Sequence, residues 1–167
     1  MSTTQKPRVI DYFAGWENHN RLLVKMVAPL TEDDLLLSPG QGLWSVRMLA
    51  CHIVAARAWW FQGWMAEGDD DLRRLIPMDD ESDETRPDAA AICAALDKSW
   101  KDVRACLERW TEDDLDAKFQ RPKPNAAGER PWRDRRYIIW HVAEHDIHHG
   151  GEISIILGMH GRPGLDM

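Results

Sequence analysis

The chain has 167 residues, with 21 Lys or Arg and 28 Asp or Glu, so its formal net charge at pH 7 is −7. This length is typical of one domain with one substantial core, and we expect a single domain over residues 1–167. The negative charge disfavours nucleic acid and anionic membranes as partners, because binding to either depends on neutralising phosphates with basic side chains.

Neither a signal peptide nor a membrane span is expected from the apolar pattern. The first residues lack an apolar segment, and no run of eighteen or more apolar residues occurs in the sequence. The three cysteines, Cys51, Cys93 and Cys106, form no C-x-x-C pair, and their odd number fits reduced thiols. These features predict a cytoplasmic protein.

Four stretches have the periodicity of amphipathic helices, and nothing alternates with period two for long enough to predict a strand. The predicted helices span residues 8–28, 45–67, 88–109 and 134–159. Ser45 is a plausible N-cap of the second helix, which has one apolar face that we expect to point into the core. This face contains Met48, Leu49, His52, Ala56, Trp59 and Trp60.

The sequence TEDDL occurs at residues 31–35 and again at residues 111–115, both times after a predicted helix. Each copy is followed by a tryptophan, Trp44 or Trp132, shortly before the next helix. A capping turn can recur by chance, but the repeated context favours two related helical hairpins. Residues 66–87 are long for a bundle connection, so we predict a crossover. The expected fold is all-α, a four-helix bundle of two helical hairpins joined by a long crossover.

Residues 141–151, HVAEHDIHHGG, contain four of the seven histidines. At about 100° per residue, all four lie on one side of the predicted helix, in an arc that includes Ile138, Val142 and Ile156. We therefore expect the four histidines to point toward the bundle interior. Protonated imidazoles would repel one another, whereas neutral imidazoles suit a divalent metal ion.

Two of these histidines have the best spacing for a shared metal ion. His145 and His149 stand in the i, i+4 relation that lets two imidazoles converge, and His141 with His145 is the next best pair. A catalytic metal usually has three protein ligands and an open position, so another helix must supply the third ligand. His52 is the obvious donor, although alone it would be more typical of a core histidine. The alternative for the pair is a solvated polar patch.

The segment HVAEH also matches H-x-x-E-H, a pattern of zinc peptidases in which the glutamate is the general base. Such a site requires a distant third ligand on a larger fold, but only 22 residues follow His145. We interpret this match as accidental.

The sequence resembles the DinB/YfiT-like family of metal-dependent four-helix-bundle proteins with a three-histidine site. The resemblance covers nearly the whole chain and is most specific at W-S-V-R-x-L-x-x-H and at H-D-I-H-H-G-G-E-I. Family members commonly read H-x-x-H-H-R-G-Q at the second motif. The resemblance therefore implies that His145, His149 and His52 are the metal ligands. Gly150 replaces the usual Arg, and Glu152 replaces the usual Gln.

The resemblance implies one divalent metal ion, zinc or nickel first and iron as a further option, because ligand type alone does not select the metal. Relatives include transferases that use low-molecular-weight thiols. We expect a thiol-dependent S-transferase acting on small molecules, with a small-molecule thiol and an apolar or electrophilic substrate as partners. The alternatives are a hydrolase with a metal-bound hydroxide, and a non-catalytic metal- or ligand-binding stress protein. An adjacent pocket favours catalysis, whereas a site closed by Glu152 favours binding.

Glu152 and His148 are the candidates for catalytic roles beside the metal. Glu152 shares the arc of His145, so it can orient a histidine, approach the metal or accept a proton.

Several large apolar side chains remain after the site is assigned. Trp59, Trp60 and Trp64 end the second helix, where they either pack against other helices or a second subunit, or form the wall of a substrate pocket. Trp140 and Ile147 lie opposite the histidines, which predicts a second packing surface and a homodimer.

Overall fold

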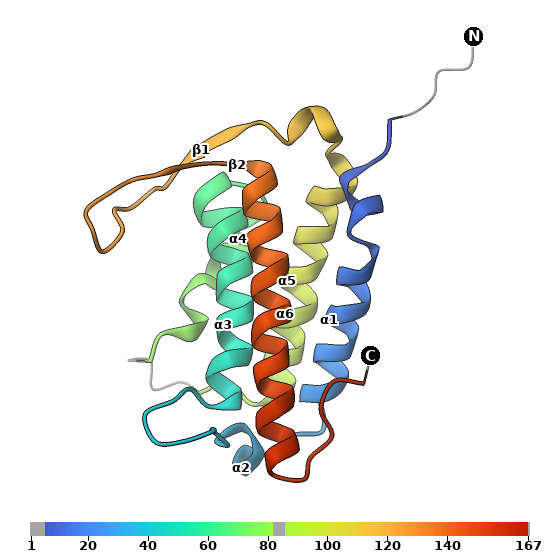
Figure 1. The fold of residues 1–167 in the computed structure, drawn as a ribbon, viewed down its shortest axis with the longest axis vertical. Coiled ribbons are helices and arrows are strands. Elements are labelled where there is room, and N and C mark those ends of the chain that lie inside the picture. The colour runs from blue at the N-terminus through green and yellow to red at the C-terminus, as the bar shows by residue number, and fades with distance from the viewer. Residues whose placement is uncertain (1–5, 82–85, 167) are drawn as a thin grey trace.

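The computed structural model describes residues 6–81 and 86–166 and has four long helices in a bundle (Figure 1). The four are α1 (Ala14–Val27), α3 (Val46–Ala58), α5 (Ala89–Arg109) and α6 (Arg135–Met159). In Figure 1, α6 lies at the front between α3 and α1, and α5 lies behind it. The predicted all-α four-helix bundle is confirmed. No described helix combines the length and apolar character that crossing a bilayer requires.

Polar side chains fix where the long helices begin. Ser45 caps α3, Asp88 caps α5 and Asp134 caps α6, and each accepts a hydrogen bond from a backbone amide of the first turn. These three helices begin within one residue of their predicted starts, and α3 continues into a π-helical turn, η2 (Trp59–Trp64).

The first predicted helix, residues 8–28, is interrupted. It consists of a 3-10 turn, η1 (Val9–Tyr12), followed by α1, because Phe13 between them has φ −121° and ψ 25°, outside the helical region.

Both TEDDL segments form the same capping turn. The amide of Thr31 donates to the Asp34 carboxylate over 3.1 Å, and the amide of Thr111 donates to the Asp114 carboxylate over 2.8 Å. The first turn opens the short helix α2 (Glu32–Leu35), and the second opens the 3-10 turn η4 (Glu112–Asp114).

The bundle carries one short pair of strands that the sequence pattern did not predict. Strands β1 (Lys118–Gln120) and β2 (Trp132–Asp134) pair antiparallel, with Phe119 opposite Arg133. Three residues per strand are too few for a period-two pattern to be recognised in a sequence. The resulting hairpin projects as an arm from one end of the bundle, just before α6 (Figure 1).

The predicted crossover, residues 66–87, contains helix α4 (Asp70–Arg74) and the 3-10 turn η3 (Ile76–Asp79). Residues 82–85 of this segment lie outside the described part of the chain. The turn η3 packs against α3, which brings acidic side chains of the crossover close to the second bundle helix.

The apolar face predicted for α3 does not point uniformly into the core. Leu49 and Ala56 are buried, but the other four members, Met48, His52, Trp59 and Trp60, are only half-buried. The fully buried side of α3 carries Ile53 and Arg57 instead, because α3 is covered by α5 and α6 along that side. His52 therefore lies at the margin of the core, where a ligand can reach it.

Candidate metal centre

Three histidines from two helices converge at the margin between α3 and α6. One ring nitrogen each of His52, His145 and His149 lies within 4.8 Å of the other two. The Nε2 atoms of His52 and His145 are 3.0 Å apart, and the ring centroids of His145 and His149 are 4.3 Å apart. The structure thus brings together the three residues that the sequence analysis predicts as ligands.

Two carboxylates orient this histidine cluster from outside. Asp79 Oδ2 accepts a hydrogen bond from His52 Nδ1 over 2.6 Å, and Glu152 Oε2 accepts one from His149 Nδ1 over 2.6 Å. Because each ring donates through Nδ1, its Nε2 carries the lone pair with which it could bind a metal ion. Histidine ligands of metal ions commonly have such partners.

Asp79 was not anticipated from the sequence. It belongs to η3 in the crossover, which contains many acidic residues, and no pattern in that segment distinguishes Asp79 from its neighbours.

The local electrostatics favour the neutral form of two histidines of the cluster, His145 and His149. Burial, helped by the neighbouring imidazoles, lowers the pKa of His145 to about 3. Burial also lowers the pKa of His149, while the hydrogen bond to Glu152 opposes this shift. Neutral imidazoles have a free lone pair, and converging imidazoles oriented by carboxylates are the donor set of a divalent transition-metal site. His145 Nδ1 is buried without a hydrogen-bond partner among the described residues.

The prediction that all four histidines of α6 point into the bundle was wrong for two of them. His148 is exposed, with 64% of its side-chain surface accessible, and its Nε2 lies 3.5 Å from Glu152 Oε1. His141 is half-buried, with its ring centroid 6.2 Å from that of His145, outside the converging set. The buried side of α6 includes Asp146 and Ile153, so the histidine arc lies at the edge of the core.

Two separate cavities adjoin the histidine cluster. One, of about 450 Å³, is lined by His149 and Glu152 together with apolar side chains such as Leu43 and Ile155. The other, of about 290 Å³, is lined by residues that include both remaining cluster histidines. These cavities share no lining residue, so they reach the cluster from different directions. The second cavity is lined by His52, Ala55, Ala56, Trp59, Trp60, Ile76, Asp79, His141 and His145.

Tryptophans contribute to both cavities. Trp44 lines the larger one, and its ring centroid lies 4.7 Å from that of His52. Trp59 and Trp60 line the smaller one, whereas the neighbouring Phe61 is buried in the core. Trp44 was not predicted as a site residue, although it begins the W-S-V-R-x-L-x-x-H motif.

No cysteine competes for the role of nucleophile. Cys51 directly precedes His52 in the sequence, but its side chain is buried, and burial raises the pKa of its thiol to about 11. Burial raises the pKa of Cys106 to about 11 as well, and that of the half-buried Cys93 is also raised. All three thiols are free. A thiol nucleophile would therefore have to come from outside the protein.

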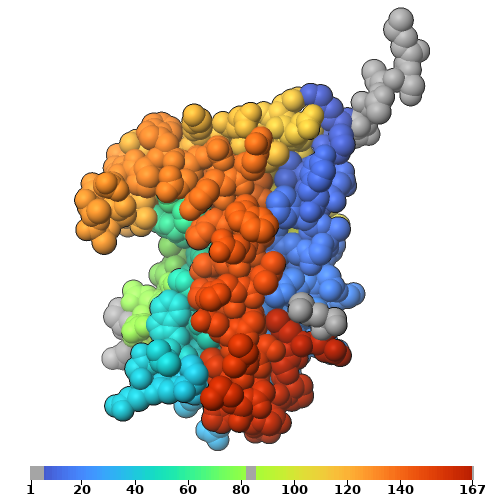
Figure 2. Space-filling view, viewed as in Figure 1, coloured from blue at the N-terminus to red at the C-terminus, as the bar shows by residue number. Residues whose placement is uncertain are grey.

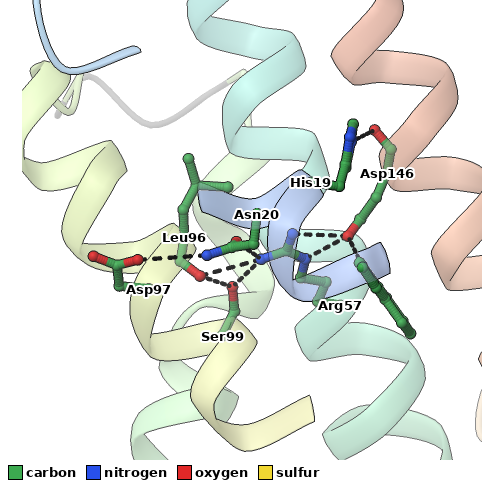
Figure 3. Close-up of polar contacts among 8 residues, drawn as sticks. His19, Asn20, Arg57, Leu96, Asp97, Ser99 and Asp146 are labelled. Atoms are coloured by element: carbon green, nitrogen blue, oxygen red, sulfur yellow. Dashed lines mark hydrogen bonds and ion pairs between the residues drawn. The ribbon is translucent and has the colours of Figure 1, made fainter. Parts of the chain in front are cut away.

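A buried ion pair links the two histidine-bearing helices behind the cluster (Figure 3). Arg57 of α3 and Asp146 of α6 are both fully buried, and Arg57 Nε donates to Asp146 Oδ2 over 2.8 Å. The same carboxylate oxygen accepts a hydrogen bond from Trp16 Nε1 of α1. Arg57 Nη1 donates to Asn20 of α1 and to Ser99 of α5, so one guanidinium connects all four long helices.

Fold and site together define a four-helix bundle with a three-histidine cluster suited to a divalent metal. The chain belongs to the DinB superfamily, whose family model matches residues 16–153. No curated protein matches this chain.

Solved structures of DinB-like proteins share the fold. One, from Bacillus cereus ATCC 10987, has a TM-score of 0.67 and 19% identity, with 98% of this chain and 99% of that chain covered. Another, from Bacillus subtilis, has a TM-score of 0.60 and 16% identity, with 91% and 93% covered.

The departure from the family pattern at Gly150 has a local explanation. Gly150 is buried against α1, and a Cβ at this position would lie 3.0 Å from ring atoms of His19 and 3.0 Å from Leu23 Cδ2. A larger side chain there requires the buried His19 or Leu23 to move by a few tenths of an ångström. The glycine therefore serves the packing of α6 against α1, away from the histidine cluster.

Proposed function

We propose that this DinB superfamily member is a metal-dependent S-transferase that joins a low-molecular-weight thiol to a small organic substrate. His52, His145 and His149 hold one divalent ion, zinc or nickel, in a superfamily that is associated with metals. The observation that carries the proposal is the pair of separate cavities beside the cluster. A transfer between two organic molecules uses two such spaces, whereas hydrolysis uses one organic molecule and water.

The bound divalent ion would supply one chemical effect, namely a lowered pKa for a thiol that reaches it. The side chains of the protein perform the rest. The larger cavity holds the thiol beside Glu152, and the smaller cavity holds the electrophilic substrate against Trp59 and Trp60. The thiol sulfur attacks the electrophilic carbon, a sulfur–carbon bond forms, and the leaving group departs with its electron pair.

Glu152 is the proposed acceptor of the thiol proton. Its carboxylate contacts His149 on one side, and 43% of its side-chain surface is exposed, so a proton can pass from it to solvent. His148 contacts the other oxygen of Glu152 over 3.5 Å and can take part in the same proton transfer.

The test incubates zinc-loaded protein, purified without a His-tag, with cysteine and a model alkyl halide, and measures the S-conjugate by mass spectrometry. We expect conjugate formation above the rate in buffer, and loss of this excess in the His149→Ala variant. Conjugate formation at the buffer rate, together with zinc-dependent hydrolysis of a model ester, would replace the transferase with the hydrolase. If the protein shows neither activity at full zinc occupancy, the alternative of a metal-binding protein without turnover would take the place of both enzymes.

A further inference from the structure

The β-hairpin before α6 has a charge opposite to that of the whole chain. Residues 117–136 contain seven Lys or Arg and two Asp or Glu, a net charge of +5, whereas the chain as a whole has −7. Two of the seven are paired, Arg135 with Glu67 and Arg136 with Asp116. The five other cations form no ion pair with the described residues, and these are Lys118, Arg121, Lys123, Arg130 and Arg133.

Two of the unpaired arginines face the bundle. Arg133 lies opposite Phe119 in the strand register, and Arg121 follows Phe119 by two residues, so the three side chains share one face of the hairpin. The Arg121 guanidinium lies 5.8 Å from the Trp64 ring centroid, and that of Arg133 lies 4.8 Å from the ring centroid of Tyr137. Arg121 Nε is buried and has no hydrogen-bond partner among the described residues.

Aromatic rings connect these arginines to the histidine cluster. Trp64 stacks on Trp60 at 4.4 Å between centroids, and Trp60 contacts His141 edge-on at 4.7 Å. Tyr137 also stacks on His141, with 5.8 Å between the two ring centroids. Trp60 and His141 then line the smaller cavity together with His145. We call the three accessible rings, Trp60, Tyr137 and His141, the aromatic surface; Trp64 itself is buried and stacks on Trp60.

The hairpin is held in place over this surface. Trp64 Nε1 donates a hydrogen bond to the Phe119 carbonyl over 3.1 Å, and the Arg135 guanidinium lies 5.2 Å from the Phe119 ring centroid. Figure 2 shows the hairpin as an overhanging arm with a recess beneath it on the side of α3. A molecule in the smaller cavity can therefore extend along the aromatic surface to the arginines.

We propose that the substrate of the smaller cavity carries a carboxylate or phosphate group, which Arg121 and Arg133 bind while its apolar part lies on the aromatic surface. This inference rests on the proposed function, because it names the substrate class of the same site. Guanidinium groups bind both anions through paired N–H donors, and the aromatic rings accept an apolar or aromatic body. The concentrated positive charge also draws a small anion toward this end of an otherwise acidic protein.

The test measures direct binding by calorimetry with the full chain at low salt. The probes are 2-naphthoate, 2-naphthyl phosphate and the neutral 2-naphthalenemethanol. We expect at least one anion to bind about tenfold more tightly than the alcohol, as charge-assisted hydrogen bonds predict. The variant R121Q/R133Q should lose this preference and keep its affinity for the alcohol. The matched control K118Q/K123Q removes the same charge at two exposed side chains that have no cation–ring contact among the described residues, and it should retain the preference.

Several outcomes would overturn the inference. Equal affinity of the wild-type protein for all three probes would do so, as would an equal loss of preference in both variants, because only the general field would then act. Salt-sensitive binding of a short DNA duplex without any preference among the naphthalenes would assign the arm to nucleic acid instead. Zinc binding and conjugate formation are measured on the same proteins. An intact anion preference without conjugate formation counts against the proposed function alone, whereas conjugate formation without the preference counts against this inference alone.

Discussion

The three converging imidazoles have different surroundings, which determine what each contributes. His52 and His149 are oriented by carboxylates, whereas His145 is the one whose pKa falls to about 3. A ring that resists protonation keeps its lone pair available over a wide pH range. His145 is therefore the ligand that we expect to bind a metal with the least competition from protons.

Removal of any one imidazole should empty the site. We predict that His52→Ala, His145→Ala and His149→Ala each lose stoichiometric zinc at neutral pH, because two imidazoles do not hold the ion firmly. The residues lie at the margin of the core, so helicity should be largely unchanged. Metal analysis and circular dichroism check this prediction, and His160→Ala, near the end of the chain, is the control. Full occupancy in His52→Ala would point to His141 as the third ligand.

The metal-free protein should lose stability as the pH falls. Because the pKa of His145 is about 3 in the folded state and 6.5 in the unfolded state, protons bind the unfolded chain preferentially between these values. The stabilising contribution is present above pH 6.5 and is lost progressively toward pH 3. At pH 5 the free energy of unfolding should be lower by about 1 kcal/mol from this residue, after allowing for partial exposure.

Urea unfolding in EDTA at pH 7 and pH 5 measures this difference. The His145→Gln variant lacks the titrating group and should show a smaller pH dependence than the wild-type protein. An identical pH dependence in the two proteins would contradict the assignment to His145.

At the scale of elements, the relation of α3 to α6 decides whether the histidines meet. Asp146 directly follows His145, and Arg57 lies five residues after His52, so the buried ion pair joins the two helices near the cluster (Figure 3). The pair also contacts α1 and α5. We infer that this network fixes the position of α6 relative to α3.

A double-mutant cycle tests the coupling between these residues. Arg57→Met or Asp146→Leu alone should destabilise the protein by about 3–5 kcal/mol, because each leaves one buried charge unpaired. The double variant should cost clearly less than the sum of the two, since no unpaired charge remains. Urea unfolding of the four proteins gives the coupling, and additive effects would show that the two charges do not depend on each other.

Sequence patterns predicted the long elements well and the short ones poorly. The helices α3, α5 and α6 have clear caps and long periodic patterns, and the predicted ligands His52, His145 and His149 follow from helix geometry and the family motif. Asp79 and the hairpin depend on how short segments pack against α3 and η2, which no local pattern encodes. The prediction that His148 points inward was wrong, because angles around a helix show which residues share a side but not where the centre of the buried face lies.

At the scale of the whole molecule, the outer side of α6 carries large apolar residues. Trp140 and Ile147 have 61% and 59% of their surface exposed, and Ile155, further along the same helix, has 65% exposed. Exposed apolar side chains on one helix are typical of an interface between subunits. We therefore continue to predict that the protein forms a homodimer through this side of α6.

Sedimentation equilibrium checks the predicted dimer. We expect a dimer at micromolar concentration that dissociates in the variant Trp140→Glu/Ile147→Glu, because charges then replace the apolar contact. Tyr12→Glu changes an equally exposed aromatic residue outside α6 and should leave the dimer intact. A monomeric wild-type protein would contradict the prediction.

The most direct measurement of the central claim replaces the native ion with cobalt and titrates small thiols while the absorption spectrum is recorded. Three neutral imidazoles leave the full positive charge on the ion, so an entering thiol should bind as thiolate and release a proton. We predict a saturable sulfur-to-cobalt charge-transfer band that is absent in the His149→Ala variant. A spectrum that responds to carboxylates or hydroxide but to no thiol would contradict the transferase, and a spectrum that responds to nothing would contradict catalysis at this site.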